Sequence, residues 1–333
     1  MRRLLAKRGT GSNEANQLYL MGRHHWNKRS WEGFEKGIEC FRQAIEKDPG
    51  YALAYAGLAD CYSGLVIYEK IPPDDGVRRA REASLRALEL DPYLAEAHTS
   101  RAYVALYWDW DWLVAEKEFQ RAIELNPRNA TAHHWYGEYL TFMGRFDEAA
   151  REKQRAVELE PASPVIRWGA GFLFYYTLRF DKAAESFREA ITLDPTFGFA
   201  HEYLGWSLVG LRAYEDAIKE FQEAFRLKPE HTSAIAGRCI AYAEAGRRND
   251  ALKALAELKE LEEQRYVSPG SFVWAYIGLS DHDKALEYLE KCYMNRADFM
   301  VGLRSRQALS IFESLRSDPR FQALLRKMNF PEK

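Results

Sequence analysis

Histidines and glutamates are the side chains of this sequence that could hold a metal ion or move a proton. His98, His133 and His201 recur at one position of a repeating pattern, and His134 and Glu138 are one helical turn apart. A pair at that spacing could chelate a metal or simply form a hydrogen bond. Because two ligands do not make a dedicated metal site, we predict structural roles for these histidines and no metal site.

Motifs of known enzymes are missing from the sequence. It contains no phosphate-binding P-loop, no dinucleotide-binding glycine fingerprint, no G-x-S-x-G nucleophile motif and no H-E-x-x-H zinc motif. Gly169-Ala170-Gly171 lies inside an expected helix, where small residues allow close packing. We therefore predict that the chain is not an enzyme and uses no cofactor.

Aromatic residues fall on one expected face of successive helices. Rings of this kind offer a large apolar area and carry much of the binding energy of protein interfaces. We predict that they line a concave groove for a peptide segment or a partner protein. The alternative is that many of them pack between neighbouring helices as core. The predicted groove residues are Tyr103, Tyr107, His134, Glu138, Phe142, Trp168, Phe172, Tyr175, Tyr176, Glu202 and Trp206.

Charge and cysteine content limit the kinds of partner and compartment. The 47 basic and 49 acidic residues give a net charge of −2, which provides no basic surface for nucleic acid or anionic lipid. The four cysteines are far apart and form no C-x-x-C pair, which favours a reduced, cytoplasmic setting. No apolar run approaches the length of a membrane span. We therefore expect the partners of the chain to be proteins, which include a second copy of the chain itself.

Six prolines set out the elements that must position these residues. Pro49, Pro92, Pro127, Pro161, Pro195 and Pro229 are separated by 43, 35, 34, 34 and 34 residues. Alanine stands five residues before each proline. Since proline cannot continue a helix and disfavours helical angles in the residue before it, each proline is expected to end a helix. A fixed period near 34 predicts a solenoid of stacked helical hairpins.

Small and aromatic residues recur with the same period. Gly137, Gly171 and Gly205 mark the first helix of three hairpins, here called helix A. In the second helix, B, a Phe recurs at Phe41, Phe119, Phe187 and Phe221, with Ser84 and Lys153 as exceptions. We expect A and B to approach closely at the small residues and the Phe rings to fill the space towards the next hairpin. Gly144 is expected to end one helix A.

This pattern resembles the tetratricopeptide repeat (TPR) family from about residue 13 to residue 294. The resemblance implies an all-α, right-handed superhelix of about eight helix-turn-helix repeats with a C-terminal capping helix. The expected boundaries are a flexible leader over residues 1–12, a solenoid over 13–300 and a capping segment over 301–333. One TPR subclass binds the acidic C-terminus of chaperones through Lys and Asn. The equivalent groove positions of this sequence hold Tyr103, Glu138, Phe172 and Trp206, with no Lys or Asn. We therefore predict that the chain does not bind that ligand.

A narrower resemblance concerns bacterial regulators. Leu18–Arg23 followed by Trp26-Asn27-Lys28-Arg29, and Trp110-Asp111-Trp112, look like a TPR module that follows a winged-helix DNA-binding domain, a nucleotide cyclase or a serine/threonine kinase. Twelve residues before the first repeat are too few for such an effector. The resemblance implies either a fragment of such a regulator or a stand-alone relative in signalling or transcriptional control.

Three departures from the period carry further expectations. A stretched connection is expected around Trp26–Gly33, about nine extra residues over Leu65–Val77, and a turn at Trp108–Trp112.

We predict a non-catalytic interaction or sensory module in bacterial signalling. The alternatives are the regulatory piece of a larger effector, and a small-ligand receptor with a closed pocket under the Trp108–Trp112 turn.

Overall fold

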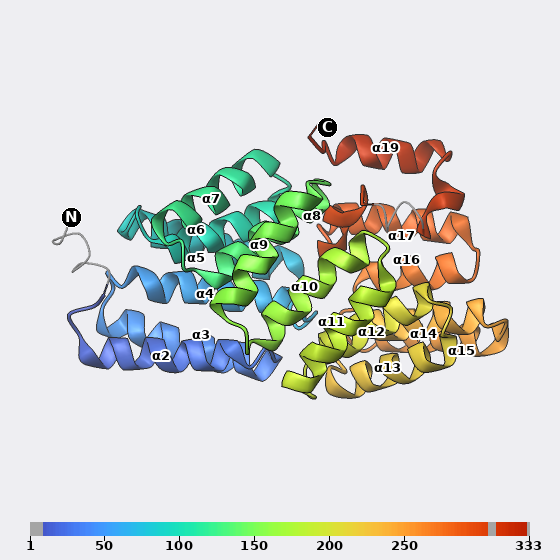
Figure 1. Cartoon of the computed structure of the whole chain (residues 1–333), viewed down its shortest axis with the longest axis horizontal. Helices are drawn as coiled ribbons and strands as arrows, with labels where there is room; N and C mark the ends of the chain where they lie inside the picture. The colour runs from blue at the N-terminus through green and yellow to red at the C-terminus, as the bar shows by residue number, and fades with distance from the viewer. Residues whose placement is uncertain (1–8, 306–310, 332–333) are drawn as a thin grey trace. The chain divides into compact units, whose positions relative to one another are not determined.

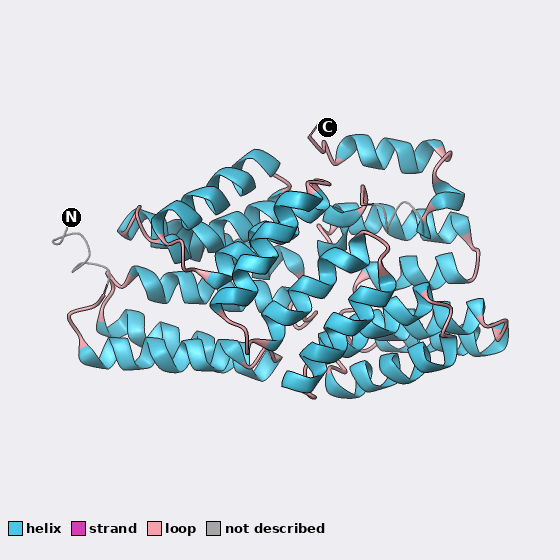
Figure 2. Cartoon of the chain, viewed as in Figure 1, coloured by secondary structure: helices cyan, strands magenta, loops and turns pink. Residues whose placement is uncertain are grey.

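The chain is helical throughout the part that the computed structural model describes, residues 9–305 and 311–331 (Figure 2). It divides into two compact units, one ending at Trp135 and the other beginning at Tyr136, so that the boundary falls inside helix α8. Residues 1–8 of the expected leader lie outside the described residues. Within those residues, no helix combines the length and the apolar character needed to cross a bilayer.

The first unit begins with three hairpins (Figure 1). A π-helical turn, η1 (Ala105–Asp109), extends the third A helix. The helices are α2 (Asn13–Asn27), α3 (Trp31–Lys47), α4 (Ala52–Ile67), α5 (Pro73–Leu90), α6 (Ala95–Val104) and α7 (Trp112–Leu125), followed by α8 (Ala130–Phe142), which contains the boundary.

The second unit continues the alternation of A and B helices and ends in short helical segments. Its described elements are α9 (Phe146–Leu159), α10 (Pro164–Tyr176), α11 (Phe180–Leu193), α12 (Gly198–Gly210), α13 (Tyr214–Leu227), α14 (Ser233–Glu244), α15 (Arg248–Glu262), α16 (Pro269–Gly278), α17 (His282–Met294), η2 (Asp298–Gly302), η3 (Glu313–Leu315) and α19 (Pro319–Lys327). Counting α8 with α9, the described residues hold the eight hairpins that the period predicted.

The proline ladder ends the B helices as expected. The residue before each proline donates its backbone N–H to the carbonyl of the alanine four residues earlier, for example Asp194 to Ala190 at 3.0 Å and Lys228 to Ala224 at 2.9 Å. This bond closes the last helical turn. The proline that follows has no N–H with which to extend the helix.

The A helices share a different ending, which places one residue in the left-handed conformation. Gly144 and Gly246 have φ angles of +77° and +75°, which glycine adopts without a steric penalty. Side chains other than glycine pay roughly 1 kcal/mol there. The equivalent residues of the other six A helices also have positive φ: Arg29, Glu69, Trp110, Leu178, Arg212 and Ser280.

Phenylalanine rings from the B helices occupy space left by glycines on two A helices. A Cβ atom added to Gly205 on α12 would lie 2.8 Å from the Phe221 ring, and one added to Gly237 on α14 would lie 2.4 Å from it. In the first unit Phe41 occupies the same position between α2 and α4. Both rings are fully buried. One ring thus joins the two helices of its own hairpin and the first helix of the next.

Two expected departures differ from the structure. The connection between α2 and α3 is only residues 28–30, because the first helix continues through Trp26 to Asn27 and Ser30 caps the second through the N–H of Gly33. The expected turn at Trp108–Trp112 is largely helical, since η1 continues α6 through Asp109. Arg101 donates to the Asp109 carboxylate at 2.7 Å and fixes this end of the hairpin.

The C-terminal part of the second unit covers the last hairpin. Phe312 stacks on Trp274 of α16 with centroids 5.2 Å apart, and lies 5.7 Å from Phe321 of α19, which packs on α17. Leu315 and Phe321 are buried. This confirms the expected capping helix, while residues 306–310 and 332–333 of the expected capping segment lie outside the described residues. A cap of this kind keeps the apolar end of the array out of water.

The packing of the rings leads to a test by truncation. Phe221→Ala should lower the free energy of unfolding of the second unit by about 3–5 kcal/mol, because it leaves a cavity against two helices. Leu252→Ala on α15, where the side chain is 45% exposed, is the matched control and should have little effect. Thermal unfolding followed by circular dichroism measures both variants, and equal melting temperatures would contradict the role given to the ring.

Candidate functional site

The predicted groove residues are largely buried. Among those eleven, only Tyr103 and Trp168 keep substantial exposure; the others are at most 9% exposed. Most of these side chains therefore pack against other groups of the chain, as the alternative described. Whether these residues contact a partner stays a prediction, since such contact would need the covering groups to move.

Rings of α8, α10 and α12 cover one another in the second unit. Phe142 meets Phe172 and Tyr176 edge-on, with centroids 5.7 and 5.3 Å apart. Tyr203 lies 5.6 Å from Phe172 and 5.4 Å from Tyr175. Burial raises the pKa of the Tyr175, Tyr176 and Tyr203 hydroxyls well above the ordinary value. These phenols are therefore neutral at physiological pH.

A segment from the C-terminal part of the same unit also lies on this wall. Gly302 closes the short helix η2, and a Cβ atom added there would lie 3.2 Å from the ring of Tyr176 and 3.4 Å from that of Phe142. Its neighbours Met300 and Val301 are buried. The aromatic wall therefore already holds a stretch of polypeptide, contributed by the chain itself.

Three partly exposed rings of the second unit lie together, Trp168 on α10 with Phe199 and Tyr203 on α12. Trp168 lies 5.3 Å from Tyr203 and 6.3 Å from Phe199. We call these three residues the Trp168 cluster. Phe199 and Tyr203 were not among the predicted groove residues, because matching positions between repeats favours the central face of each helix A.

Glu202 belongs to a buried polar cluster beside these rings. Lys228 Nζ donates to one carboxylate oxygen at 2.5 Å and Ser233 Oγ to the other at 2.6 Å, while Nδ1 of His231 is 3.2 Å away. Burial opposes ionisation of Glu202, but Lys228 and His231 outweigh it and hold its pKa far below the usual range. Glu202 is thus a buried anion with its partners supplied, which suits a structural role.

Lys153 is one of the two exceptions in the phenylalanine series, and its surroundings explain how a lysine is accommodated there. Its methylene chain lies against Gly137, where other repeats place a ring, and its ammonium is 3.7 Å from the carboxylate of Glu138. Burial lowers the pKa of Lys153 to about 8, against the opposing pull of Glu138. The break in the series at position 153 was the sequence signal for this pair.

The predicted groove residues of the first unit also pack against other rings. Tyr103 lies 4.6 Å from Tyr107 and 4.2 Å from Trp135, centroid to centroid. Trp108, Trp110 and Trp112 of the adjacent segment are buried. Tyr103 alone among these rings keeps appreciable exposure.

The recurring histidines have the structural role that their spacing predicted. Nε2 of His98, His133 and His201 lies 3.0–3.2 Å from the carbonyl of Pro92, Pro127 and Pro195 respectively. Nδ1 of His201 also meets Glu220 of α13 at 2.7 Å. Each imidazole therefore ties a helix A to the loop before it. Across the described ranges, no three His, Cys, Asp or Glu side chains gather as metal ligands would.

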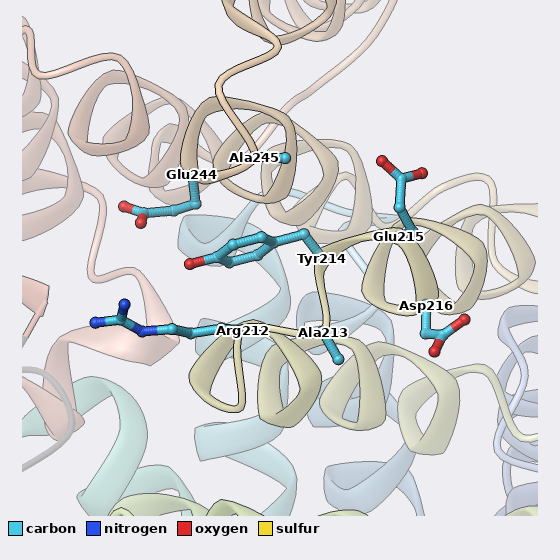
Figure 3. Close-up of a pocket in the computed structure, with 7 residues that line it drawn as sticks. All are labelled: Arg212, Ala213, Tyr214, Glu215, Asp216, Glu244 and Ala245. Atoms are coloured by element: carbon cyan, nitrogen blue, oxygen red, sulfur yellow. The ribbon is translucent and has the colours of Figure 1, made fainter.

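An open pocket lies on the surface of the second unit, at the start of α13 and the end of α14 (Figure 3). Arg212, Tyr214 and Glu244 point to one side of it and Glu215 and Asp216 to the other. The latter two pair with Arg247 and Lys219. The lining residues are Arg212, Ala213, Tyr214, Glu215, Asp216, Glu244 and Ala245.

Comparison with known families agrees with the repeat architecture. Three family models, each described as tetratricopeptide repeat, match residues 118–151, residues 140–196 and 169–232, and residues 212–304. These matches follow one another from residue 118 to residue 304. The chain belongs to the tetratricopeptide repeat family.

Solved structures with the same fold include yeast Tom70, which has a TM-score of 0.53 and 20% identity over 97% of this chain and 69% of that one. A tetratricopeptide repeat protein from Parabacteroides merdae has a TM-score of 0.52 and 14% identity over 80% of this chain and all of that one. At these identities the likeness shows the fold alone.

Curated relatives include the transcriptional regulator HilA of Salmonella typhimurium, which is 23% identical over 138 residues. The matched region is 41% of this chain and 25% of HilA. The HilA of Salmonella typhi matches equally. The chain therefore spans about a quarter of the length of the curated relatives it matches.

The buried Lys153 predicts a dependence of stability on pH. Between about pH 8 and pH 10.5 the folded protein releases the Lys153 proton while the unfolded chain, with an ordinary lysine pKa of 10.5, keeps it. The unfolded state then binds more protons, so the free energy of unfolding should rise with pH. Lys153→Met removes this contribution. Urea unfolding of both proteins at pH 7.5, 8.5 and 9.5 measures it, and the same pH slope in both would contradict the assignment.

Proposed function

We propose that the chain is a non-catalytic interaction module that binds a peptide segment of a partner protein through the A helices of its second unit. Membership of the TPR family supports a protein or peptide partner, since stacked helical hairpins present an extended surface for binding. The observation that carries the proposal is the close approach of Gly302 to Phe142 and Tyr176, such that an added Cβ atom would lie within 3.4 Å of each ring. A wall that holds a segment of its own chain has the chemistry to hold one from another protein.

The first contact with a partner is assigned to the Trp168 cluster, because its rings are the accessible part of the wall. Aromatic residues lose little conformational entropy on binding and bury a large area. The buried predicted residues Phe142 and Tyr176 would join the interface only if the partner displaced the segment around Gly302. The aromatic wall therefore has an outer part, the Trp168 cluster, and an inner part, which the segment around Gly302 covers.

A bacterial, cytoplasmic regulatory pathway is the proposed setting. The resemblance of the Trp26–Arg29 segment to regulator modules supports it, and so does the match to HilA, a transcriptional regulator. The same match favours a second candidate function, in which this chain is the sensory part of a larger effector. Measuring the mass of the native polypeptide in its host decides between them, because the second candidate requires a polypeptide longer than 333 residues.

The Trp168 cluster gives a direct test of partner binding. Trp168→Ala and Phe199→Ala should each reduce the partner recovered by affinity capture from the native host by about tenfold or more, as expected for an interface hot spot. Met294→Ala is the control, since that side chain is 72% exposed at the end of α17, away from the cluster in sequence. Quantitative mass spectrometry measures recovery, and circular dichroism checks that each variant is folded.

Equal recovery by wild type, Trp168→Ala and Phe199→Ala would move the interface away from this cluster. Loss of recovery with Met294→Ala as well would assign the effect to another surface or to general destabilisation.

A further inference from the structure

Two arginine side chains lie over the ring of Trp26 in the first unit. The guanidinium carbon of Arg23 is 4.0 Å from the centroid of the Trp26 ring, and that of Arg29 is 3.4 Å from it. Trp26 also meets Trp135 edge-on at 6.4 Å, and Trp135 packs against Tyr103. Two cations therefore stand among aromatic rings that come from three A helices, α2, α6 and α8.

Among the residues that the structure describes, one carboxylate, that of Asp60, pairs with one of these two cations, Arg23. Nη1 of Arg23 donates to one oxygen of Asp60 at 2.9 Å, and Ser100 Oγ donates to the other at 2.6 Å. Within the described residues, the guanidinium of Arg29 forms no hydrogen bond or ion pair, and its Nε is buried without an acceptor. Arg29 is thus held by its stacking on Trp26 and not by an acid.

The charge of Arg29 is held at an energetic cost. Burial lowers the pKa of Arg29 to about 10, so the group is still protonated at neutral pH. A cation removed from water without an anionic partner is unfavourable, and an added anion relieves that cost. A guanidinium offers parallel N–H groups whose geometry suits a planar carboxylate.

The backbone at Arg29 is also placed unfavourably. Its φ of +49° lies in the left-handed region, where glycine is the usual residue at the end of a helix. Its carbonyl accepts a hydrogen bond from the Tyr68 hydroxyl, which fixes the position. Arginine is not the residue type that this backbone conformation favours, and the Arg29 side chain is not paired with an acid of the described residues. These two features make Arg29 a candidate ligand-binding residue.

We propose that Arg29, stacked on Trp26 and supported by Arg23, is a binding site for a carboxylate, presented as an acidic side chain of a peptide. The peptide source of that carboxylate rests on the proposed function, whereas the anion site itself does not. The site is separate from the Trp168 cluster. An acidic residue in the partner would then add charge recognition to the aromatic contacts.

The test uses the full chain labelled with nitrogen-15 at arginine, in which the Nε–Hε signal of Arg29 reports binding. Three probes are titrated: acetyl-Gly-Glu-Glu-Gly-amide, its neutral analogue acetyl-Gly-Gln-Gln-Gly-amide, and inorganic phosphate. The acidic peptide should shift the Arg29 signal, and the neutral analogue should not. Arg29→Gly should weaken binding of the acidic peptide by about tenfold or more, as expected when a hydrogen-bonded charge is removed.

The chain offers a matched control in Arg212→Gly. Arg212 ends another A helix with φ +60° and its side chain is exposed, so the same substitution is made in the same backbone conformation. Glycine suits that conformation at both positions, which keeps both variants folded. Arg212→Gly should bind the acidic peptide as the wild type does.

Three results would overturn the proposal: undiminished binding of the acidic peptide by Arg29→Gly, equal binding of the glutamine peptide, or a response of Arg29 to phosphate alone. Failure of the proposed function looks different. In that case the acidic peptide would bind in an Arg29-dependent way, while capture of the partner would not depend on Trp168.

Discussion

The packing of a B-helix ring against glycines on two A helices is the constraint from which the other features follow. Phe221 fits only because Gly205 and Gly237 lack a Cβ atom, and Phe41 uses the same device in the first unit. Each ring brings neighbouring A helices close together. Side chains on the facing sides of those helices must then pack against one another, so the aromatic wall of α8, α10 and α12 is mostly buried.

Three charged side chains, Lys153, Arg23 and Arg29, enter the interior between these packed helices. Where Lys153 replaces the ring, its ammonium needs the carboxylate of Glu138 within the same unit. Where Arg23 enters the first unit, Asp60 supplies the balancing charge. Arg29 is different, because no acid of the described residues meets it. A buried pair contributes little net stability, whereas an unmatched buried charge is costly, and this contrast is why Arg29 invites an external anion.

The sequence predicted the fold well because its period has a local physical cause at each position. Prolines end helices through their missing N–H, and Gly144 ends helix α8 through its positive φ. The recurring histidines have the structural role that was expected, and the structure shows that each lies within hydrogen-bond distance of a proline carbonyl. All of these effects act within one hairpin or between neighbours, so position matching is enough to find them.

The site was harder to predict because exposure depends on contacts between distant segments. Matching positions indicates which face of α10 carries Phe172 and Tyr176, but it does not reveal that Gly302 returns to that wall. Likewise, Trp26 and Arg29 were noticed as a motif, but their arrangement around one indole requires coordinates. The division near Trp135 also has no composition signal, since the repeat pattern runs through it.

Photo-crosslinking from the wall tests the central claim most directly. Benzoylphenylalanine replaces Trp168 in the full chain, or Met294 as the exposed control, and the protein is irradiated in its native host. If the second unit binds another polypeptide through the Trp168 cluster, a defined covalent adduct with one partner forms from position 168 and not from 294. Irradiation that gives no adduct at 168, or the same adducts at both positions, would contradict the account.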